Sequence, residues 1–230
     1  MNIAEQAYEK GIRKVTIGFS TGKDSVVGLD MLLKAGIEPI PIYFYCVPGL
    51  KFIENNLKMY EDHFGLKIVK LPHPMLYDYI NHMDWQPYDR ALSIPIYGKA
   101  TFAEFTSAYL QCTQQKDVEY DCNCMKMADS LNRRLLLSKK TDIDDEKKII
   151  YLTKYLTNND CFDYIKKNNI PLTDDYKIWG RSWDGLKYDY TKGVKKYYPD
   201  DYELIKEYFP LIEAEVLRYK LVKKYDYEKR

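Results

Sequence analysis

The stretch that decides the fold is Val15-Thr16-Ile17-Gly18-Phe19-Ser20-Thr21-Gly22-Lys23-Asp24-Ser25. It begins as an apolar run of strand length and ends in small and polar residues. Asp24–Lys34 then place apolar side chains at helical spacing, and Ala35-Gly36 suits the end of a helix. The sequence therefore predicts a strand over 15–19, a turn over 20–23 and a helix over 24–34.

The alternation of strand and helix continues after this helix. Ile40–Tyr45 is an apolar run typical of a buried strand, residues 52–64 keep helical spacing, and Leu66–Leu71 is a third strand-like run. Such alternation favours parallel strands joined by right-handed crossovers. We predict an α/β fold with a twisted parallel sheet flanked by helices. Ligands of such sheets bind beyond the carboxyl ends of the strands, where the 20–23 turn falls.

The pattern is weaker in the rest of the chain. Helices are expected over 3–13, 101–111 and 158–167, the last capped by its Asn-Asn-Asp run, and within 121–140 around residues 127–137. We predict a strand at 149–152, a charged loop over 142–148, an ordered loop over 171–199, and one or two helices over 200–224. The expected organisation is one domain, residues 1–199, with residues 200–230 as its C-terminal helical extension.

Bulk composition narrows the class of protein. A chain of 230 residues with 46% hydrophobic residues favours a folded domain over disorder. The net charge of +1 gives no global basic field for nucleic acid. The first residues lack the apolar core of a signal peptide, and no apolar run reaches the roughly 18 residues of a membrane span. The five cysteines are expected to be reduced thiols of a cytoplasmic protein.

The turn after the first strand fits more than one motif. Three residues separate Gly18 from Gly22, where a Walker A loop needs four, and Asp24 stands where its metal-binding hydroxyl belongs. Gly18-Phe-Ser-Thr-Gly22 also fits the G-x-S-x-G elbow of serine hydrolases around Ser20, although no histidine follows residue 82. An ordinary turn of small polar residues is a further alternative.

The whole string Ser20-Thr21-Gly22-Lys23-Asp24-Ser25 resembles the PP-loop, S-G-G-K-D-S, of N-type ATP pyrophosphatases, with Thr21 in place of the first glycine. Small residues let backbone N–H groups approach phosphate oxygens, and the following helix presents its positive end to the anion. Ser20 and Ser25 can donate hydroxyl hydrogen bonds. Lys23 adds positive charge where pyrophosphate would leave.

Two later segments resemble the phosphoadenosine-phosphosulfate (PAPS) reductase-like branch of that family. One runs from Asp121-Cys-Asn-Cys-Met-Lys126 into the Ser-containing segment 128–134, and the other covers residues 155–171. True PAPS reductases carry a lysine-free loop and a C-terminal catalytic cysteine, whereas this chain has Lys23 and no cysteine after Cys161. The chain is thus more similar to the lysine-containing, ATP-using members of the family. It departs from the family in lacking the acidic residue often found after the second strand.

The resemblance implies an adenine nucleotide alpha-hydrolase-like fold and a reaction. An acceptor would attack the α-phosphate of ATP, with Mg²⁺ sharing the charge, to give an adenylate and pyrophosphate. The alternative is a nucleotide-binding regulatory subunit with little turnover; a thioredoxin-linked sulfonucleotide reductase and a serine hydrolase are further options. The resemblance implies an adenine nucleotide, a ParB-like protein, nucleic acid as an acceptor and a second copy of the chain as partners. It implies no association with a membrane.

Candidate site residues follow from these motifs. The catalytic candidates are Lys23, Asp24 and Arg133. The nucleotide-binding candidates are Ser20, Thr21, Gly22, Lys23, Asp24, Ser25, Tyr43, Lys126 and Arg181.

Several roles stay open at the level of sequence. Asp24 either helps to bind the metal ion or caps its helix. Lys126, Arg133 and Arg134 either reach the ligand or form a solvated basic face, and Arg181 sits in a Gly-flanked loop that either closes over the site or is structural. Cys122 and Cys124, with Cys112, are interpreted as zinc or cluster ligands, a persulfide carrier, or buried thiols. No protein-held metal is expected.

Overall fold

The computed structural model describes residues 1–91, 93, 98–218 and 221 of the chain. Its helices are α1 Ile3–Glu9, α2 Lys23–Lys34, α3 Lys51–Phe64, α4 Pro74–Asn81, α5 Tyr88–Ala91, α6 Phe102–Cys112, α7 Leu131–Ser138, α8 Asn158–Lys167, α9 Asp175–Trp179, α10 Tyr188–Tyr197 and α11 Pro199–Tyr208. Its strands are β1 Lys14–Gly18, β2 Glu38–Tyr45, β3 Val69–Pro72, β4 Tyr120–Asn123, β5 Ile143–Asp144 and β6 Ile149–Tyr151. No described helix is long and apolar enough to cross a membrane.

The six strands form one sheet in the order β3-β2-β1-β4-β6-β5. β1 pairs in parallel with β2 and β4, β4 pairs in parallel with β6, and β5 pairs antiparallel with β6. The predicted fold class, a mostly parallel sheet flanked by helices, is confirmed. After β1 the chain moves outward to β2 and β3 and then returns to β4 on the other side of β1. The carboxyl ends of β1 and β4 thus lie at the point where the strand order reverses.

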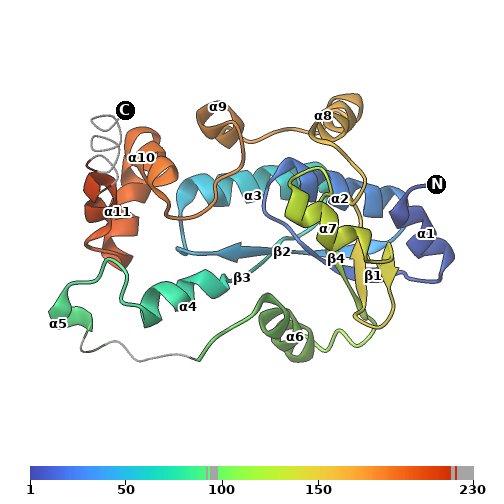
Figure 1. The fold of residues 1–230 in the computed structure, drawn as a ribbon, viewed down its shortest axis with the longest axis horizontal. Coiled ribbons are helices and arrows are strands. Elements are labelled where there is room, and N and C mark those ends of the chain that lie inside the picture. Colours follow the sequence, from blue (N-terminus) through green and yellow to red (C-terminus); the bar gives the residue numbers. More distant parts are fainter. Residues whose placement is uncertain (92, 94–97, 219–220, 222–230) are drawn as a thin grey trace. The chain divides into compact units, whose positions relative to one another are not determined.

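The predicted first strand and helix form because their buried side chains face a common core. Val15, Ile17 and Phe19 are at most 1% exposed, and Val26 and Leu29 of α2 are fully buried. α2 packs against β1, and α1 and α8 pack against α2. Figure 1 shows α2 and α8 on one side of the sheet and α6 on the other. These contacts fix the direction of α2, and so the position of the turn that precedes it.

Two helices begin with complete capping boxes. Asn2 caps α1 together with Glu5, and Thr157 caps α8 together with Asp160. The sequence placed the cap of α8 in its Asn-Asn-Asp run, and this was wrong by one residue. The Thr157 side chain accepts from the backbone N–H of Asp160, whose carboxylate accepts in turn from the N–H of Thr157. Asn158 is therefore left in the first turn with its amide side chain available for another contact.

The described residues form two compact units. The first comprises Met1–Phe44, Leu57–Leu71 and Ala103–Thr173, and it contains β1, β4, β6, α2, α7 and α8. The second comprises the described residues of Tyr45–Asn56, Pro72–Phe102 and the chain from Asp174 onward, and it contains an aromatic cluster, with Phe52 stacked on Tyr198 at 4.7 Å and edge-on to Trp183. The predicted division at residue 199 stays a prediction.

Three local predictions were wrong. β4 was missed because it is only four residues long, too short for the alternation of buried residues with Asp121 and Asn123 to indicate a strand. The predicted charged loop over 142–148 contains β5. The predicted loop over 171–199 contains α9 and α10, and α10 buries Tyr190 and Val194 along one face. The described part of 200–224 is helical, as predicted, in α11 and residues 212–218.

Candidate phosphate-binding site

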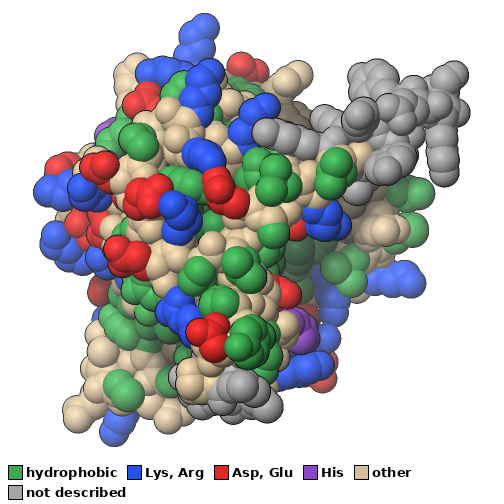
Figure 2. Space-filling model, turned by 90° about the vertical axis from the view of Figure 1, so that its left-hand side faces the viewer, with side chains coloured by type: hydrophobic (Ala, Val, Ile, Leu, Met, Phe, Trp, Pro, Cys, Tyr) green, Lys and Arg blue, Asp and Glu red, His purple; other side chains and the backbone are tan. Residues whose placement is uncertain are grey.

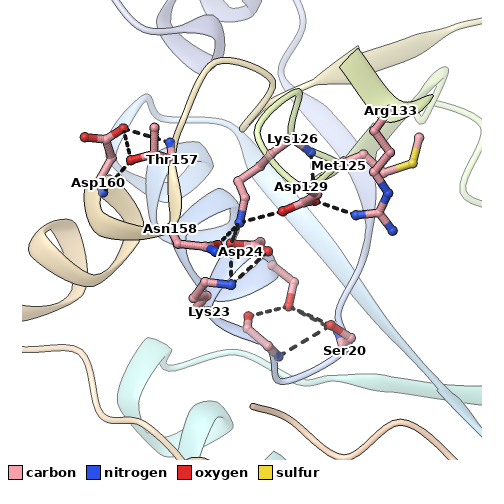
Figure 3. Close-up of polar contacts among 12 residues, drawn as sticks. Ser20, Lys23, Asp24, Met125, Lys126, Asp129, Arg133, Thr157, Asn158 and Asp160 are labelled. Carbon is pink, nitrogen blue, oxygen red and sulfur yellow. Dashed lines mark hydrogen bonds and ion pairs between the residues drawn. The ribbon is translucent and has the colours of Figure 1, made fainter. Parts of the chain in front are cut away.

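The 20–25 segment leaves the carboxyl end of β1 and enters α2. Gly22 is the N-cap of α2, in extended conformation and without a side-chain cap, so N–H groups of the first turn point toward the segment. The Ser25 hydroxyl donates to the carbonyl of Gly22 at 2.9 Å and accepts from the N–H of Ser20 at 3.2 Å. The Ser20 and Ser25 hydroxyls are 3.3 Å apart. Two serines thereby hold the segment in a tight turn around their own hydroxyl groups (Figure 3).

Thr21 takes a backbone conformation that favours glycine. Its φ is +57°, in the left-handed region, and its side chain is buried. A β-branched residue in this region carries steric strain between its side chain and backbone. Glycine, which stands at this position in the S-G-G-K-D-S motif, adopts such a φ without this strain.

A buried lysine joins three separate segments next to this turn. The ammonium of Lys126 donates to Asp24 at 2.6 Å and to Asn158 at 2.8 Å, and it lies 3.3 Å from the carboxylate of Asp129. Its side chain is 0% exposed. Lys126 follows β4, Asp24 is in the first turn of α2, and Asn158 is in the first turn of α8 (Figure 3).

Further charged side chains extend this arrangement, which we call the Lys126 network (Lys23, Asp24, Lys126, Asp129, Arg133 and Asn158). The Lys23 ammonium is 3.4 Å from both carboxylate oxygens of Asp24 and 5.8 Å from the ring centre of Phe162. Arg133, in α7, pairs with Asp129, and its side chain is 47% exposed. Three cationic and two anionic side chains meet beside the N-terminus of α2, so the local charge favours an anion.

The pKa values of the network follow from these contacts. Burial lowers the pKa of Lys126, but the hydrogen bond to Asp24 and the negative charge of Asp24 outweigh burial, and the pKa is raised. Burial raises the pKa of Asp129, but the positive charges and hydrogen bonds of Lys126 and Arg133 lower it by more. The pKa of Asp129 is therefore below its usual value. Both groups are therefore charged at neutral pH.

The structure brings some of the predicted site residues together and leaves others elsewhere. Lys23, Asp24, Lys126 and Arg133 belong to the Lys126 network, and Arg134 is exposed. Tyr43 is a buried residue of β2, one position after Ile42, the register partner of Gly18.

Arg181 belongs to the second unit. There it lies 3.5 Å from Asp184, and its guanidinium carbon lies 5.9 Å from the ring centre of Tyr190. Its predicted role at the nucleotide site stays a prediction.

Two members of the network were not proposed as site residues from the sequence. Asp129 stands four positions before Arg133, a spacing that places the two on one helical face and gave a weak signal. Asn158 gave none, because its contact with Lys126 joins residues 32 positions apart in the sequence. Position in the fold, not local pattern, selects Asn158.

The cysteines lie mainly inside the first unit. Cys122 and Cys161 are buried and Cys124 is half-buried, whereas Cys112 is exposed. Burial raises the pKa of Cys161 to about 12, and it raises the pKa of Cys124 and Cys122 above the usual value for thiols. Within the described part of the chain, no group of three or more His, Cys, Asp or Glu side chains is arranged to hold a metal ion. These thiols fit the interpretation as protonated packing residues.

The contacts of Ser20 bear on the hydrolase alternative. Among the described residues, Ser20 hydrogen-bonds with Ser25 and with the N–H of Gly22, and with no histidine. The His73 ring instead accepts from the N–H of Met75 at the start of α4, in the second unit. A nucleophilic serine needs a base within hydrogen-bond reach.

Comparison with known proteins gives limited likeness. No known family model matches the chain. A stretch of 70 residues is 43% identical to part of an uncharacterized protein of Methanocaldococcus jannaschii. This stretch covers 29% of the present chain and only 14% of the length of that relative.

Two solved structures are similar to this chain across most of its length. The NH3-dependent NAD synthetase from Campylobacter jejuni subsp. jejuni, in complex with the nitrate ion, has a TM-score of 0.47 and 13% identity, covering 94% of this chain and 89% of that chain. The NMN synthetase from Francisella tularensis has a TM-score of 0.44 and 13% identity, covering 93% of this chain and 91% of that one. At such scores neither likeness carries an inference about activity. The fold and the site together give an α/β protein with a turn of small and polar residues at the reversal point of its sheet.

Proposed function

We propose that the first unit binds ATP through the 20–25 segment and cleaves it at the α-phosphate, transferring the adenylyl group to an acceptor and releasing pyrophosphate. One observation carries the proposal: the S-T-G-K-D-S segment lies at the carboxyl end of β1 beside β4, where the strand order reverses. Open parallel sheets bind ligands at this point, and the N-terminus of a helix favours phosphate.

The side chains of the segment suit polyphosphate. The N–H groups of the first turn of α2, the hydroxyls of Ser20 and Ser25 and the ammonium of Lys23 are donors of the kind that bind phosphate oxygens. Catalysis of phosphoryl or adenylyl transfer depends on positioning and on neutralising charge that develops on the oxygens.

Among the described residues, the 20–25 segment and its neighbours do not offer a resident site for Mg²⁺. Asp24 is the carboxylate of the segment, and it already accepts from Lys126 at 2.6 Å and lies 3.4 Å from Lys23. Two ammonium groups beside one carboxylate oppose a divalent cation at the same place. Mg²⁺ therefore enters the proposal only as the ion that accompanies ATP, since it binds readily to phosphates and keeps several waters.

The first test is calorimetric titration with α,β-methylene-ATP and Mg²⁺. The analogue cannot be cut between its α- and β-phosphates. We expect Lys23→Ala to weaken binding about tenfold or more, since a hydrogen bond to a charged group is worth about 1.5–3 kcal/mol. Lys34→Ala, at the other end of α2 where Lys34 pairs with Asp30, is the matched control and should bind like the wild type. Equal affinity in wild type and Lys23→Ala would overturn the proposal.

A second measurement decides the reaction. With ATP and a suitable acceptor, the products should be an adenylate and pyrophosphate. Appearance of ADP and inorganic phosphate instead would contradict attack at the α-phosphate. Tighter binding of 3′-phosphoadenosine 5′-phosphate than of the ATP analogue would favour the sulfonucleotide branch. Lys23 would then not distinguish an ATP-using protein from a sulfonucleotide-binding one.

A second candidate is a nucleotide-binding regulatory subunit with little turnover. The observation that favours it is the engagement of Asp24 by two lysines, which leaves the segment without a carboxylate directed to the metal ion. Nucleotide binding without pyrophosphate release, in the presence of sulfate, small carboxylic acids or nucleic acid as acceptors, would support this candidate. Membership of the PAPS reductase-like group, a ParB-like partner, self-association and a cytoplasmic location are part of the proposal and need their own tests.

A further inference from the structure

The Lys126 network contains a competition between two lysines for one carboxylate. Asp24 lies 2.6 Å from the buried ammonium of Lys126 and 3.4 Å from the half-buried ammonium of Lys23. The shorter contact is with Lys126, whose side chain has no exposed surface. Asn158 and Asp129 complete the surroundings of the Lys126 ammonium with two more oxygen acceptors.

An ammonium has three donors, and three protein side chains face that of Lys126. An additional phosphate oxygen would have to displace one of these partners. The sequence predicted Lys126 as a nucleotide ligand, whereas its position inside the protein is that of a group that holds other side chains in place.

We propose that Lys126 is a positioning residue: it draws the Asp24 carboxylate inward and so keeps the charge of Lys23 directed to the polyphosphate anion. This inference rests on the proposed function for the identity of the ligand. Its physical basis is that a carboxylate interacts most strongly with its nearest cation, and more strongly where water is excluded. Without Lys126, the nearest cation left to Asp24 is Lys23, and the two would pair at the expense of the anion.

The proposal links three elements that are distant in sequence. Asp24 and Lys126 are 102 positions apart, and Lys126 and Asn158 are 32 positions apart. Lys126 therefore fastens the start of α2 and the start of α8 to the segment that follows β4. Displacing any one of these segments would alter the position of Asp24, and with it the electrostatic environment of Lys23.

The decisive variants are Lys126→Met, Asp24→Asn and the double variant. Lys126→Met keeps most of the apolar stem and removes the charge. We expect it to weaken binding of inorganic tripolyphosphate and of α,β-methylene-ATP by about 10- to 100-fold, the loss found at metal sites when a group that orients a ligand is removed. Adding Asp24→Asn should restore most of this loss, because an uncharged side chain no longer attracts Lys23. If Lys126 contacted the anion itself, the double variant would bind as weakly as Lys126→Met, and the proposal would be overturned.

Lys154→Met is the matched control for the loss of a buried lysine. The Lys154 side chain is 4% exposed, and it pairs with Asp142 at 2.9 Å and with the carbonyl of Lys140 in the same unit. It should lower the free energy of unfolding, as Lys126→Met does, and leave tripolyphosphate affinity unchanged. An equal loss of affinity in both variants would reduce the role of Lys126 to general stability and contradict the proposal.

Hydrogen–deuterium exchange on the ligand-free protein separates this inference from the proposed function. Lys126→Met should increase exchange of the backbone amides over 20–25, and exchange should stay increased in the double variant, because Asp24→Asn does not restore the contact that fastens the start of α2. Asn158→Ala removes one acceptor of Lys126 at the exposed start of α8, so it should fold normally and cause a smaller increase of the same kind. If the wild type binds neither tripolyphosphate nor α,β-methylene-ATP, the proposed function fails. Independently of that result, unchanged exchange in Lys126→Met and in Asn158→Ala would overturn the role of Lys126.

Discussion

At the scale of single residues, Thr21 is a β-branched residue with a left-handed φ, a conformation that favours glycine. A β-branched residue at a φ of +57° costs on the order of 1–3 kcal/mol, and a glycine there would relieve that strain. Glycine would also give up the buried methyl group and add freedom to the unfolded chain, each worth about 0.5–1 kcal/mol. These contributions nearly balance.

We therefore expect Thr21→Gly to change the free energy of unfolding by less than about 1 kcal/mol. Thr16→Gly is the matched comparison, because Thr16 is equally buried but sits in β1 and donates to Asp121 at 2.7 Å. It should cost about 2 kcal/mol or more through the lost hydrogen bond and the flexible strand residue. Urea unfolding of both variants checks this. An equal cost for the two substitutions would show that Thr21 is not strained.

The thiols give a second prediction at this scale. Cys161 is fully buried and its pKa is raised to about 12, so at pH 8 only about one molecule in 10,000 carries the reactive thiolate. Cys112 is exposed. Iodoacetamide at pH 8 should label Cys112 in the folded protein and leave Cys161 unmodified until urea is added, as peptide mass mapping would show. Because the raised pKa keeps the thiol protonated, a moderate increase in pH should not change this order. Labelling of both thiols at similar rates would contradict the described burial.

At the scale of elements, α2 lies very close to the segment after β4. A Cβ on Gly28 would come within 2.6 Å of the Cys124 sulfur and 3.4 Å of Ile17 and Leu152 side chains. A glycine inside a helix costs about 1 kcal/mol relative to alanine, so its presence is explained by this close approach. The same packing brings the start of α2 to Lys126.

Gly28→Ala should therefore lower the free energy of unfolding by about 1–3 kcal/mol, although alanine is the better helix former. Cys124→Ala removes the sulfur atom that the new methyl group would meet. The double variant should recover most of the loss that Gly28→Ala causes, which a double-mutant cycle of unfolding free energies measures as coupling between the two sites. Additive effects would mean that α2 does not approach Cys124 as closely as described.

How much of the fold and of the candidate site the sequence predicts depends on how far apart in the chain the interacting residues lie. β1, the turn and α2 follow from side chains that are adjacent or one helical turn apart, and all three were predicted. β4 was missed because its alternation of apolar and polar side chains extends over only four residues, and its assignment depends on pairing with β1 and β6. α10 was missed because Gly193 interrupts it, yet that glycine is where the Trp179 indole packs against the helix. The partners of Lys126 depend on contacts between distant segments, which local patterns do not contain.

At the scale of the whole molecule, the numbers of positive and negative side chains nearly cancel. The net charge is +1, and Figure 2 shows Lys and Arg side chains interspersed with Asp and Glu side chains and with hydrophobic ones on the face in view. Many lysines are also paired, as Lys58 is with Asp62 and Lys206 with Glu203. Long-range attraction of a polyanion needs an excess of one sign over a wide surface. An anion is instead favoured locally, at the 20–25 segment.

This distinction yields a prediction for nucleic acid, one of the proposed acceptors. Non-specific binding to DNA is driven by release of counterions from phosphates that lysine and arginine side chains neutralise. With few unbalanced cations, the protein should bind a random 30-base-pair duplex with a Kd weaker than about 10 µM at 150 mM salt, and with a shallow salt dependence. Fluorescence anisotropy across a salt series measures both. Binding in the nanomolar range with a steep salt dependence would reveal a basic surface outside the face in Figure 2, and it would move nucleic acid to the first place among acceptors. Weak binding would direct the search to small acceptors that reach the 20–25 segment without help from the protein's overall charge.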